Sequence, residues 1–308
     1  MAQRVFVTGA SGFVGSAIVS ELLRRPFAVS ALTRRKNPRE IAGDVREVRG
    51  DLSQSAVLDE ALPDCAAVIH LVGIIMENPS QGVTFQRVHV EGTRSIVDAS
   101  RRAGVKRFIH MSALGTRAGA RSEYHKTKWQ AEQLVRASGL DWTIIRPSMI
   151  HGPDGEFMKM EAKWARKQAP PFLFMPYFGA GLLGLGGAGR LQPVYVLDVA
   201  RAFVDAIANP STSGKTYDLG GSEQMTWPEM HRASARAIVG KNRLTMPIPA
   251  WYAKMLAAIV PQSILPFNRD QVIMSQEDNT CDLAGFKTDF GWEPTAFGQA
   301  LSEYARAL

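Results

Sequence analysis

The first half of the chain alternates short apolar runs with longer amphipathic segments, and this alternation limits the fold more than any other feature. The runs that we expect to form strands are rich in β-branched residues and span residues 4–8, 28–33, 45–48, 67–72, 107–112 and 142–146. Helical periodicity marks the segments 14–24, 57–62, 85–103 and 124–137. Strands that are apolar on both faces and separated by helices predict a parallel sheet built by right-handed crossovers.

After residue 148 the alternation is lost, and Met, Pro, Gly and aromatic residues become frequent. A strand and helix over 194–207 and a strand over 216–219 are expected to return to the sheet layer. The predicted fold class is therefore α/β, a Rossmann-type doubly wound parallel sheet with a smaller, interleaved C-terminal cap. Residues 1–153 and 192–221 are expected to form the nucleotide-binding core. Residues 154–191 and 222–308 are expected to form the smaller substrate or cap region.

A glycine-rich turn, residues 8–15 (TGASGFVG), directly follows the first expected strand and opens the first helix. Gly9 permits the tight turn, Gly12 lets backbone N–H groups approach a pyrophosphate, and Gly15 allows close packing of the helix on the strand. The helix N-terminus adds unpaired N–H groups and a partial positive charge. The turn predicts a dinucleotide site, and a strand–helix turn without a ligand is the alternative.

The end of the second expected strand indicates which dinucleotide is bound. NAD-binding folds place a carboxylate about 20 residues beyond the glycines, where it bonds the ribose 2′-hydroxyl. Here Arg34, Arg35 and Lys36 follow the strand without an acid, which predicts NADP(H) in preference to NAD(H). Arg34 is the first candidate because a guanidinium binds phosphate bidentately and stacks on adenine. A solvated basic loop is the alternative.

Three polar side chains are candidates for catalysis. Tyr124 and Lys128 are four residues apart on one face of an expected helix, and Ser112 ends the fifth strand, where it is placed to bond a substrate oxygen. A tyrosine that acts near neutral pH must lose about three units from a pKa of roughly 10, or about 4 kcal/mol. A nearby ammonium and a nicotinium ring both favour the phenolate. The pair also arises by chance, and Glu132 offers Lys128 an ordinary ion pair.

In this order the motifs resemble the short-chain dehydrogenase/reductase superfamily, in its extended or atypical branch. The resemblance is carried by residues 8–15 (TGASGFVG), 50–52 (GDL), 70–73 (HLVG), 110–115 (HMSALG), 124–128 (YHKTK), 144–153 (IIRPSMIHGP), 192–202 (QPVYVLDVARA) and 216–221 (TYDLGG). More narrowly, the chain is similar to the branch that contains the NAD(P)H-binding accessory subunit of respiratory complex I and its bacterial relatives. The narrower likeness rests on residues 89–93 (HVEGT), 107–115 (RFIHMSALG), 270–279 (DQVIMSQEDN) and 291–301 (GWEPTAFGQAL).

The resemblance implies that Ser112, Tyr124 and Lys128 occupy the positions of the family's catalytic triad. Tyrosine would be the general acid/base, and lysine would lower its pKa while bonding the nicotinamide ribose. Pro147 would pack near the nicotinamide, or simply end the sixth strand, and Asp51 would reach the adenine edge or cap a helix. The expected cofactor contacts are Gly9, Ser11, Gly12, Phe13, Gly15, Arg34, Arg35, Asp51, Leu52, Leu71, Gly73, Tyr124, Lys128 and Pro147.

Two departures from the family pattern bear on turnover and leave cofactor binding untouched. Extended members commonly carry Asn-Val-x-Gly-Thr where this chain has HVEGT, so His89 stands in place of the asparagine. The segment 113–123, which follows Ser112, is short, glycine-bearing and polar.

Metal and nucleic-acid chemistry are not indicated. His70, His110 and His151 lie in or just after expected strands with no Asp, Glu or Cys cluster at ligand spacing, so we expect core or pocket histidines and no metal site. The net charge is +7, and residues 1–50 alone carry nine Lys and Arg against four Asp and Glu. This excess beside the glycine turn points to a phosphorylated dinucleotide, and no nucleic-acid partner is expected.

Cysteine usage and the apolar segments bear on location. Cys65 and Cys281 are the only cysteines, which excludes a disulfide framework and favours a reducing compartment without a disulfide-linked partner. No signal peptide is recognisable, so a cytoplasmic location is expected.

Residues 172–189 are uncharged but rich in glycine, which favours an apolar loop beside a pocket over a membrane helix. Surface attachment to the inner face of a membrane is the alternative. The Met and Trp residues over 227–255 indicate core packing or a lipophilic pocket.

Three functions are compatible with these features. The first is an NADPH-dependent reductase, or a related epimerase, in which Tyr124 passes a proton to or from a small, lipophilic substrate. The second is a non-catalytic NADPH-binding accessory or regulatory subunit, resembling that of respiratory complex I. The third is quinone or membrane-lipid chemistry at an acidic bilayer surface. Peripheral association with a membrane or with a respiratory complex accompanies the last two.

Overall fold

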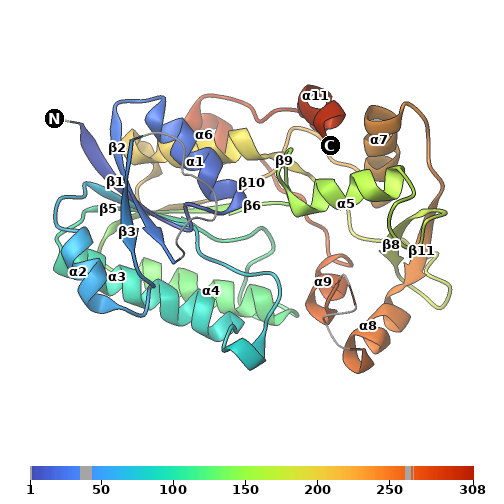
Figure 1. Cartoon of the computed structure of the whole chain (residues 1–308), viewed down its shortest axis with the longest axis horizontal. Coiled ribbons are helices and arrows are strands. Elements are labelled where there is room, and N and C mark those ends of the chain that lie inside the picture. Colours follow the sequence, from blue (N-terminus) through green and yellow to red (C-terminus); the bar gives the residue numbers. More distant parts are fainter. Residues whose placement is uncertain (1, 35–43, 261–264, 266) are drawn as a thin grey trace. The chain divides into compact units, whose positions relative to one another are not determined.

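The first unit of the protein is built on a seven-stranded parallel sheet (Figure 1). The computed structural model describes residues 2–34, 44–260, 265 and 267–308. In spatial order the strands are β10 (Lys215–Leu219), β6 (Asp141–Pro147), β5 (Arg107–Met111), β4 (Ala67–His70), β1 (Gln3–Thr8), β2 (Phe27–Thr33) and β3 (Val45–Arg49). Each neighbouring pair runs parallel. The order reverses between β1 and β4, which is the switch point of a doubly wound sheet, so the predicted fold class is confirmed.

Helices cover both faces of this sheet. Figure 1 shows α1 (Phe13–Leu23) and α6 (Val196–Ala208) on one face, and α2 (Ser55–Ala61), α3 (Gly92–Arg102) and α4 (Glu123–Arg136) on the other. The expected helix over 85–103 is interrupted, because its first part, η2 (Gln86–Glu91), is a π-helix. Such insertions are rare and often lie at functional sites.

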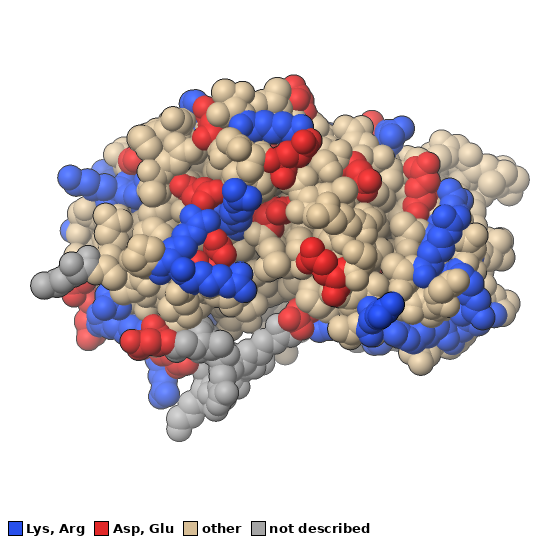
Figure 2. Space-filling view, turned by 90° about the horizontal axis from the view of Figure 1, so that it is seen from above, with Lys and Arg blue, Asp and Glu red and all other residues tan. Residues whose placement is uncertain are grey.

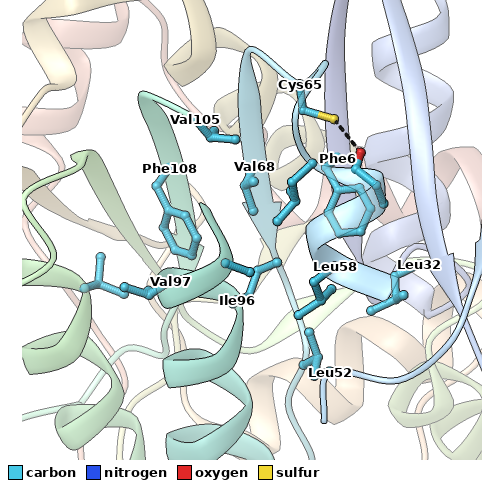
Figure 3. Close-up of a cluster of buried hydrophobic side chains, with 14 of the residues drawn as sticks. Phe6, Leu32, Leu52, Leu58, Cys65, Val68, Ile96, Val97, Val105 and Phe108 are labelled. Carbon is cyan, nitrogen blue, oxygen red and sulfur yellow. Dashed lines mark hydrogen bonds between the residues drawn. The ribbon is translucent and has the colours of Figure 1, made fainter. Parts of the chain in front are cut away.

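The core of the first unit lies between the sheet and the helices of the second face (Figure 3). It contains Phe6, Leu32, Leu52, Leu58, Cys65, Val68, Ile96, Val97, Val105 and Phe108, each at most 8% exposed. Cys65 donates from Sγ to the carbonyl oxygen of Ala61 at 3.4 Å, and burial raises the pKa of its thiol to about 11. Cys65 and Cys281 are not joined in a disulfide.

The chain passes between two compact units several times. The first unit consists of Met1–Pro147, Val196–Leu219 and Leu283–Trp292, and the second of Ser148–Tyr195, Gly220–Asp282 and Glu293–Leu308. The segment Leu283–Trp292 has no counterpart in the division expected from the sequence. It contributes α10 (Ala284–Phe290) to the first unit.

Aromatic packing explains why this late segment joins the first unit. The rings of Phe286 and Phe290 lie 6.4 and 5.1 Å from the ring of Tyr217 on β10. Trp292 donates from Nε1 to Asp205 on α6 at 2.9 Å. These contacts join residues that are far apart in the sequence, so local sequence patterns do not predict them.

The second unit has two small sheets. β7 (Ile150–His151) pairs with β9 (Val194–Tyr195), so the strand expected at 194 does not return to the main sheet. β8 (Met175–Gly179) pairs with β11 (Thr245–Pro249). The helices are α5 (Glu156–Ala165), α7 (Trp227–Val239), α8 (Ala250–Ile259), α9 (Arg269–Met274) and α11 (Phe297–Tyr304). Among the described residues, no helix is both long and apolar enough to cross a membrane.

Candidate functional site

The glycine turn has the backbone conformation that its sequence predicts. Gly9 has φ +76°, a region that favours glycine, and the N–H of Gly12 donates to the carbonyl oxygen of Gly9 at 3.0 Å. A Cβ on Gly15 would lie 2.1 Å from that same oxygen, so α1 can approach β1 this closely only without a side chain there. Ser11 lies within the turn, and Phe13 is the first residue of α1.

The N-terminus of α1 is suited to a phosphate group. Gly12 is its N-cap, no side chain caps the helix, and the first turn contains no acidic residue. The backbone N–H groups of this turn therefore keep their partial positive charge without a competing carboxylate. The cradle fits the pyrophosphate of a dinucleotide, which would be held by the backbone from Gly12 onward.

The expected contacts beyond β2 and β3 are partly placed. Arg34 is exposed and directly follows β2, whereas Arg35 lies outside the described residues. Asp51 accepts from the N–H of Ser53 at 3.0 Å, while the N-cap of α2 is Gln54, so the suggestion that Asp51 caps this helix is wrong. Leu52 is 8% exposed and packs in the core.

The carboxyl end of β4 lies beside Lys128. Leu71 is buried, and its N–H donates to the carbonyl oxygen of Thr8 at 3.3 Å, which holds the ends of β4 and β1 together. Gly73 is exposed, but a Cβ there would lie 3.0 Å from Nζ of Lys128. The structure thus brings three of the expected contacts, Leu71, Gly73 and Lys128, to one edge of the sheet.

Helix α4 positions Tyr124 and Lys128. Ser122 caps its N-terminus by accepting from the N–H of His125 at 3.2 Å, which fixes Tyr124 in the first turn. Lys128 is 2% exposed, and its Nζ donates to the carbonyl oxygen of Met111, at the end of β5, at 3.1 Å. Burial lowers the pKa of Lys128 to about 8.

Glu132 does not serve as the ordinary ion-pair partner of Lys128. Its two carboxylate oxygens, which are buried, each accept from Arg146 at 2.7 Å. The negative charge of Glu132 raises the pKa of Lys128, but by less than burial lowers it. The ammonium group is therefore held at the end of the sheet and not in an exposed helix pair.

Tyr124 lies in an aromatic surrounding. The rings of Phe85, His89 and His125 are centred 5.9, 5.4 and 5.3 Å from its ring, all edge-on. Burial raises the pKa of Tyr124 to about 12. The phenol therefore keeps its proton at neutral pH in this structure.

Ser112 and Pro147 lie at neighbouring strand ends. The N–H of Ser112 donates to the carbonyl oxygen of Ile145 at 2.8 Å, and its hydroxyl donates to Oγ1 of Thr116 at 3.4 Å. Pro147 is the last residue of β6, and its carbonyl oxygen accepts from Leu114 at 2.9 Å. β5 and β6 therefore end together, with Ser112 directly after Met111, the partner of Lys128.

His89 belongs to the site, although the sequence motifs marked it only as a departure from the family pattern. Its Nε2 lies 3.1 Å from both the N–H and the carbonyl oxygen of Ile74, and its Nδ1 is hydrogen-bonded to Oγ1 of Thr127 at 2.9 Å. Thr127 donates in turn to the carbonyl oxygen of Glu123 at 2.9 Å. Burial and the charge of Lys128 lower the pKa of His89 to about 2. The ring is thus a neutral link between η2, the loop after β4, and α4.

Two more neutral histidines lie inside the sheet. His70 is hydrogen-bonded to Thr8 at 2.7 Å and to Thr93 at 3.1 Å, and its ring stacks on that of His110 at 5.4 Å. Neither ring nitrogen of His110 has a hydrogen-bond partner in the structure. Burial lowers the pKa of His70 to about 3 and that of His110 well below its usual value.

The remaining histidine of the expected set lies in the second unit. Nδ1 of His151 is hydrogen-bonded to the hydroxyl of Tyr304 at 2.8 Å, and burial lowers its pKa to about 3. Within the part of the chain that the structure describes, no three His, Cys, Asp or Glu side chains gather as metal ligands would.

Comparisons with known proteins agree with this geometry. A family model described as NAD(P)H-binding matches residues 9–164. The mitochondrial NADH dehydrogenase [ubiquinone] 1 alpha subcomplex subunit 9 of Mus musculus is 33% identical over 308 residues, which cover 94% of this chain and 76% of that protein. A ceramide reductase of Caulobacter vibrioides is 30% identical over 243 residues, covering 78% and 72%.

The fold is also shared with solved structures whose sequences are less similar to this chain than those of the relatives above. UDP-glucose 4-epimerase from Thermotoga maritima, solved with UDP-glucose, superposes with a TM-score of 0.75 at 19% identity, covering 99% of each chain. The parallel sheet, the glycine turn, the Tyr–Lys helix and the family match lead to one conclusion. The chain belongs to the NAD(P)H-binding, short-chain dehydrogenase/reductase-like family.

Proposed function

We propose that this chain is an NADPH-dependent reductase of a small, lipophilic carbonyl compound, with Tyr124 as the proton donor. The observation that carries the proposal is the burial of the Lys128 ammonium at the end of the sheet, one helical turn from Tyr124. Its hydrogen bond to Met111 uses one of its three donors. The other two are available to a ribose hydroxyl, which is the role the resemblance assigns to this lysine.

NADPH, when bound, would supply the hydride that reduces the carbonyl carbon of the substrate. As that carbon accepts the hydride, Oη of Tyr124 donates its proton to the carbonyl oxygen, so that the product is an alcohol and the tyrosine is left as a phenolate. The Lys128 ammonium stabilises that phenolate, which then regains a proton from water. Ser112 would hold the carbonyl oxygen before transfer.

The titration of Tyr124 favours the reductive direction. Reduction needs the protonated phenol, and burial raises the pKa of Tyr124 to about 12, which keeps the proton in place. Oxidation of an alcohol, or the first step of an epimerisation, needs the phenolate as base. With the pKa of Tyr124 raised to about 12, that base is scarce at neutral pH.

NADP(H) and a lipophilic substrate are supported by separate observations. Arg34 is exposed directly after β2, where the 2′-phosphate of NADP(H) would lie. One relative acts on ceramide, by its name, and that similarity supports a lipophilic substrate for this chain. The expected cytoplasmic location is part of the same proposal.

A second candidate is a non-catalytic NADPH-binding subunit of a respiratory complex. The complex I subunits of Mus musculus and Neurospora crassa match 94% and 98% of this chain, more than the ceramide reductase does. His89 also favours it, since its hydrogen bonds to Ile74 and Thr127 serve position and not proton transfer. In that role the protein binds NADPH and converts no substrate.

The test is NADPH oxidation, followed by absorbance, against aldehydes, ketones, quinones and nucleotide sugars. Tyr124→Phe should lower kcat by about 100-fold or more, as expected for loss of a general acid. Tyr217→Phe is the matched control, because its hydroxyl bonds Asp289 away from the site. Turnover that survives in Tyr124→Phe contradicts the proposed role, and NADPH binding without turnover of any substrate favours the second candidate.

A further inference from the structure

Exposed apolar side chains are concentrated in the second unit. Among the described residues, every exposed large apolar side chain apart from Ile75 and Leu197 lies in one of two segments, 162–195 and 230–269. We call this set the apolar patch: Phe172, Leu173, Leu182, Leu183, Leu185, Leu244, Met246, Trp251, Tyr252, Met255 and Ile259. Leu182, Leu185 and Ile259 are each more than 70% exposed. Such a concentration is unusual on a protein that is surrounded only by water.

Backbone contacts join the parts of the apolar patch. β8 and β11 pair in register, with Pro176 opposite Met246, and the N–H of Met175 donates to the carbonyl oxygen of Leu244 at 2.8 Å. Trp251 donates from Nε1 to the carbonyl oxygen of Leu182 at 3.0 Å, which ties the glycine-rich loop to the start of α8. The loop, the strand pair and the helix therefore present neighbouring surfaces.

Helix α8 has the reverse of the usual surface pattern. It buries its small residues Ala250 and Ala253 and exposes its large ones, Trp251, Met255 and Ile259. Those three residues lie at i, i+4 and i+8, so they form a stripe along one side of the helix. The expectation that the Met and Trp residues over 227–255 indicate core packing is wrong for this part of the segment, although Met230 is fully buried.

The same two segments contain cations and no carboxylates. Residues 162–195 and 230–269 include no Asp or Glu, and ten cationic residues, Lys163, Arg166, Lys167, Arg190, Arg232, Arg236, Lys241, Arg243, Lys254 and Arg269. Lys241 and Arg243 come just before Leu244, and Lys254 lies within α8. Figure 2 looks onto the side of α7 and shows Lys and Arg side chains next to one another in its right-hand part, whereas α8, at the bottom of Figure 1, faces away from this view.

We propose that the apolar patch docks on an anionic lipid membrane, as an interfacial surface and not a spanning one. Apolar side chains beside an aromatic pair, Trp251 and Tyr252, suit the boundary between headgroups and acyl chains, where such rings place an apolar body and a polar edge. Lysine and arginine side chains can bury their stems and reach lipid phosphates. The two segments carry no carboxylate of their own and so add no repulsion from an acidic membrane, while Asp278 beside them accepts from the N–H of Arg190 at 2.8 Å.

The test is co-sedimentation of the full chain with vesicles of phosphatidylcholine alone and with phosphatidylglycerol added. We expect binding to the anionic vesicles, weakened by salt, and little binding to the neutral ones. The variant Leu182→Ser/Leu183→Ser/Leu185→Ser should lower the partition coefficient by about tenfold or more, and Lys241→Gln/Lys254→Gln by about fivefold for each charge removed. Leu197→Ser, which alters an exposed leucine of the first unit, should bind as the wild type does.

The outcomes separate this proposal from its alternatives. Equal binding to neutral and anionic vesicles, or unchanged binding by the triple leucine variant, would overturn it. If the wild type fails to bind vesicles but is a dimer by sedimentation velocity, and the leucine variant is a monomer, then a second copy covers the apolar patch. The assay needs neither cofactor nor substrate, so its result does not depend on the proposed reductase activity.

Discussion

The glycine turn offers a pair of substitutions that should separate folding from cofactor binding. Gly15→Ala places a methyl group 2.1 Å from the carbonyl oxygen of Gly9 and 2.8 Å from Cα of Ala10. Both neighbours are backbone atoms of the turn, so no side-chain rotation relieves the overlap. Gly12→Ala is milder, because its new methyl group meets only the oxygen of Gly9, at 3.2 Å.

The magnitudes follow from these distances. Overpacking costs about 1–3 kcal/mol, and backbone overlap places Gly15→Ala at the upper end of that range. Alanine recovers about 1 kcal/mol through helix propensity, which leaves a net loss of about 2 kcal/mol, or about 4–8 °C in Tm. Gly12→Ala should cost less than about 1 kcal/mol, since it only replaces one N-cap residue by a poorer one.

The two variants are compared by thermal unfolding without ligand and by calorimetric titration with NADPH. Gly15→Ala should lower Tm. Gly12→Ala should lower Tm by less than Gly15→Ala does but raise the Kd for NADPH by about tenfold or more, because its methyl group lies where the phosphate would meet the backbone. An unchanged Tm for Gly15→Ala would refute the packing argument. NADPH affinity retained by Gly12→Ala would refute the placement of the pyrophosphate.

Two further predictions concern buried charge. His70 and His110 have folded-state pKa values below the unfolded value of about 6.5, so their contribution to stability is present above that pH and is lost as the pH falls, by at most about 1.4 kcal/mol per pH unit per histidine. His110→Leu should therefore make the fall in the free energy of unfolding between pH 7 and pH 5 shallower, as measured by urea unfolding. Arg107 donates to Ala206, Asp141, Thr143 and Thr212 while 8% exposed, so Arg107→Met should cost about 3–5 kcal/mol in the same assay, whereas the exposed Arg102→Met should cost under about 1 kcal/mol.

Local patterns predicted the first unit well. Apart from α3, which begins at Gly92 and not near residue 85, the expected strands and helices of its first 147 residues lie within about three residues of their expected ends, because each is bounded by a change of periodicity or a turn residue. Gly9, Gly12 and Gly15 act within one turn, and the Tyr124–Lys128 pair within one helix. Such features depend on neighbours in sequence, which is why a single chain suffices to find them.

Contacts between distant segments could not be predicted in the same way. The joining of His89 to Ile74 and Thr127 depends on a π-helix, which has no distinctive sequence signal. The return of residues 283–292 to the first unit depends on ring packing against Tyr217. The apolar residues of α8 suggested a core, and only their exposure reveals a surface.

The measurement that tests the account most directly is the affinity of the purified protein for NADPH and NADH by calorimetry. We predict tighter binding of NADPH by about tenfold or more, the value of one charge-assisted bidentate contact, and loss of that preference in Arg34→Asp. Arg24→Asp, which alters an arginine whose side chain is 68% exposed, should keep it. Failure to bind either nucleotide, or an NADPH preference that survives in Arg34→Asp, would contradict the account.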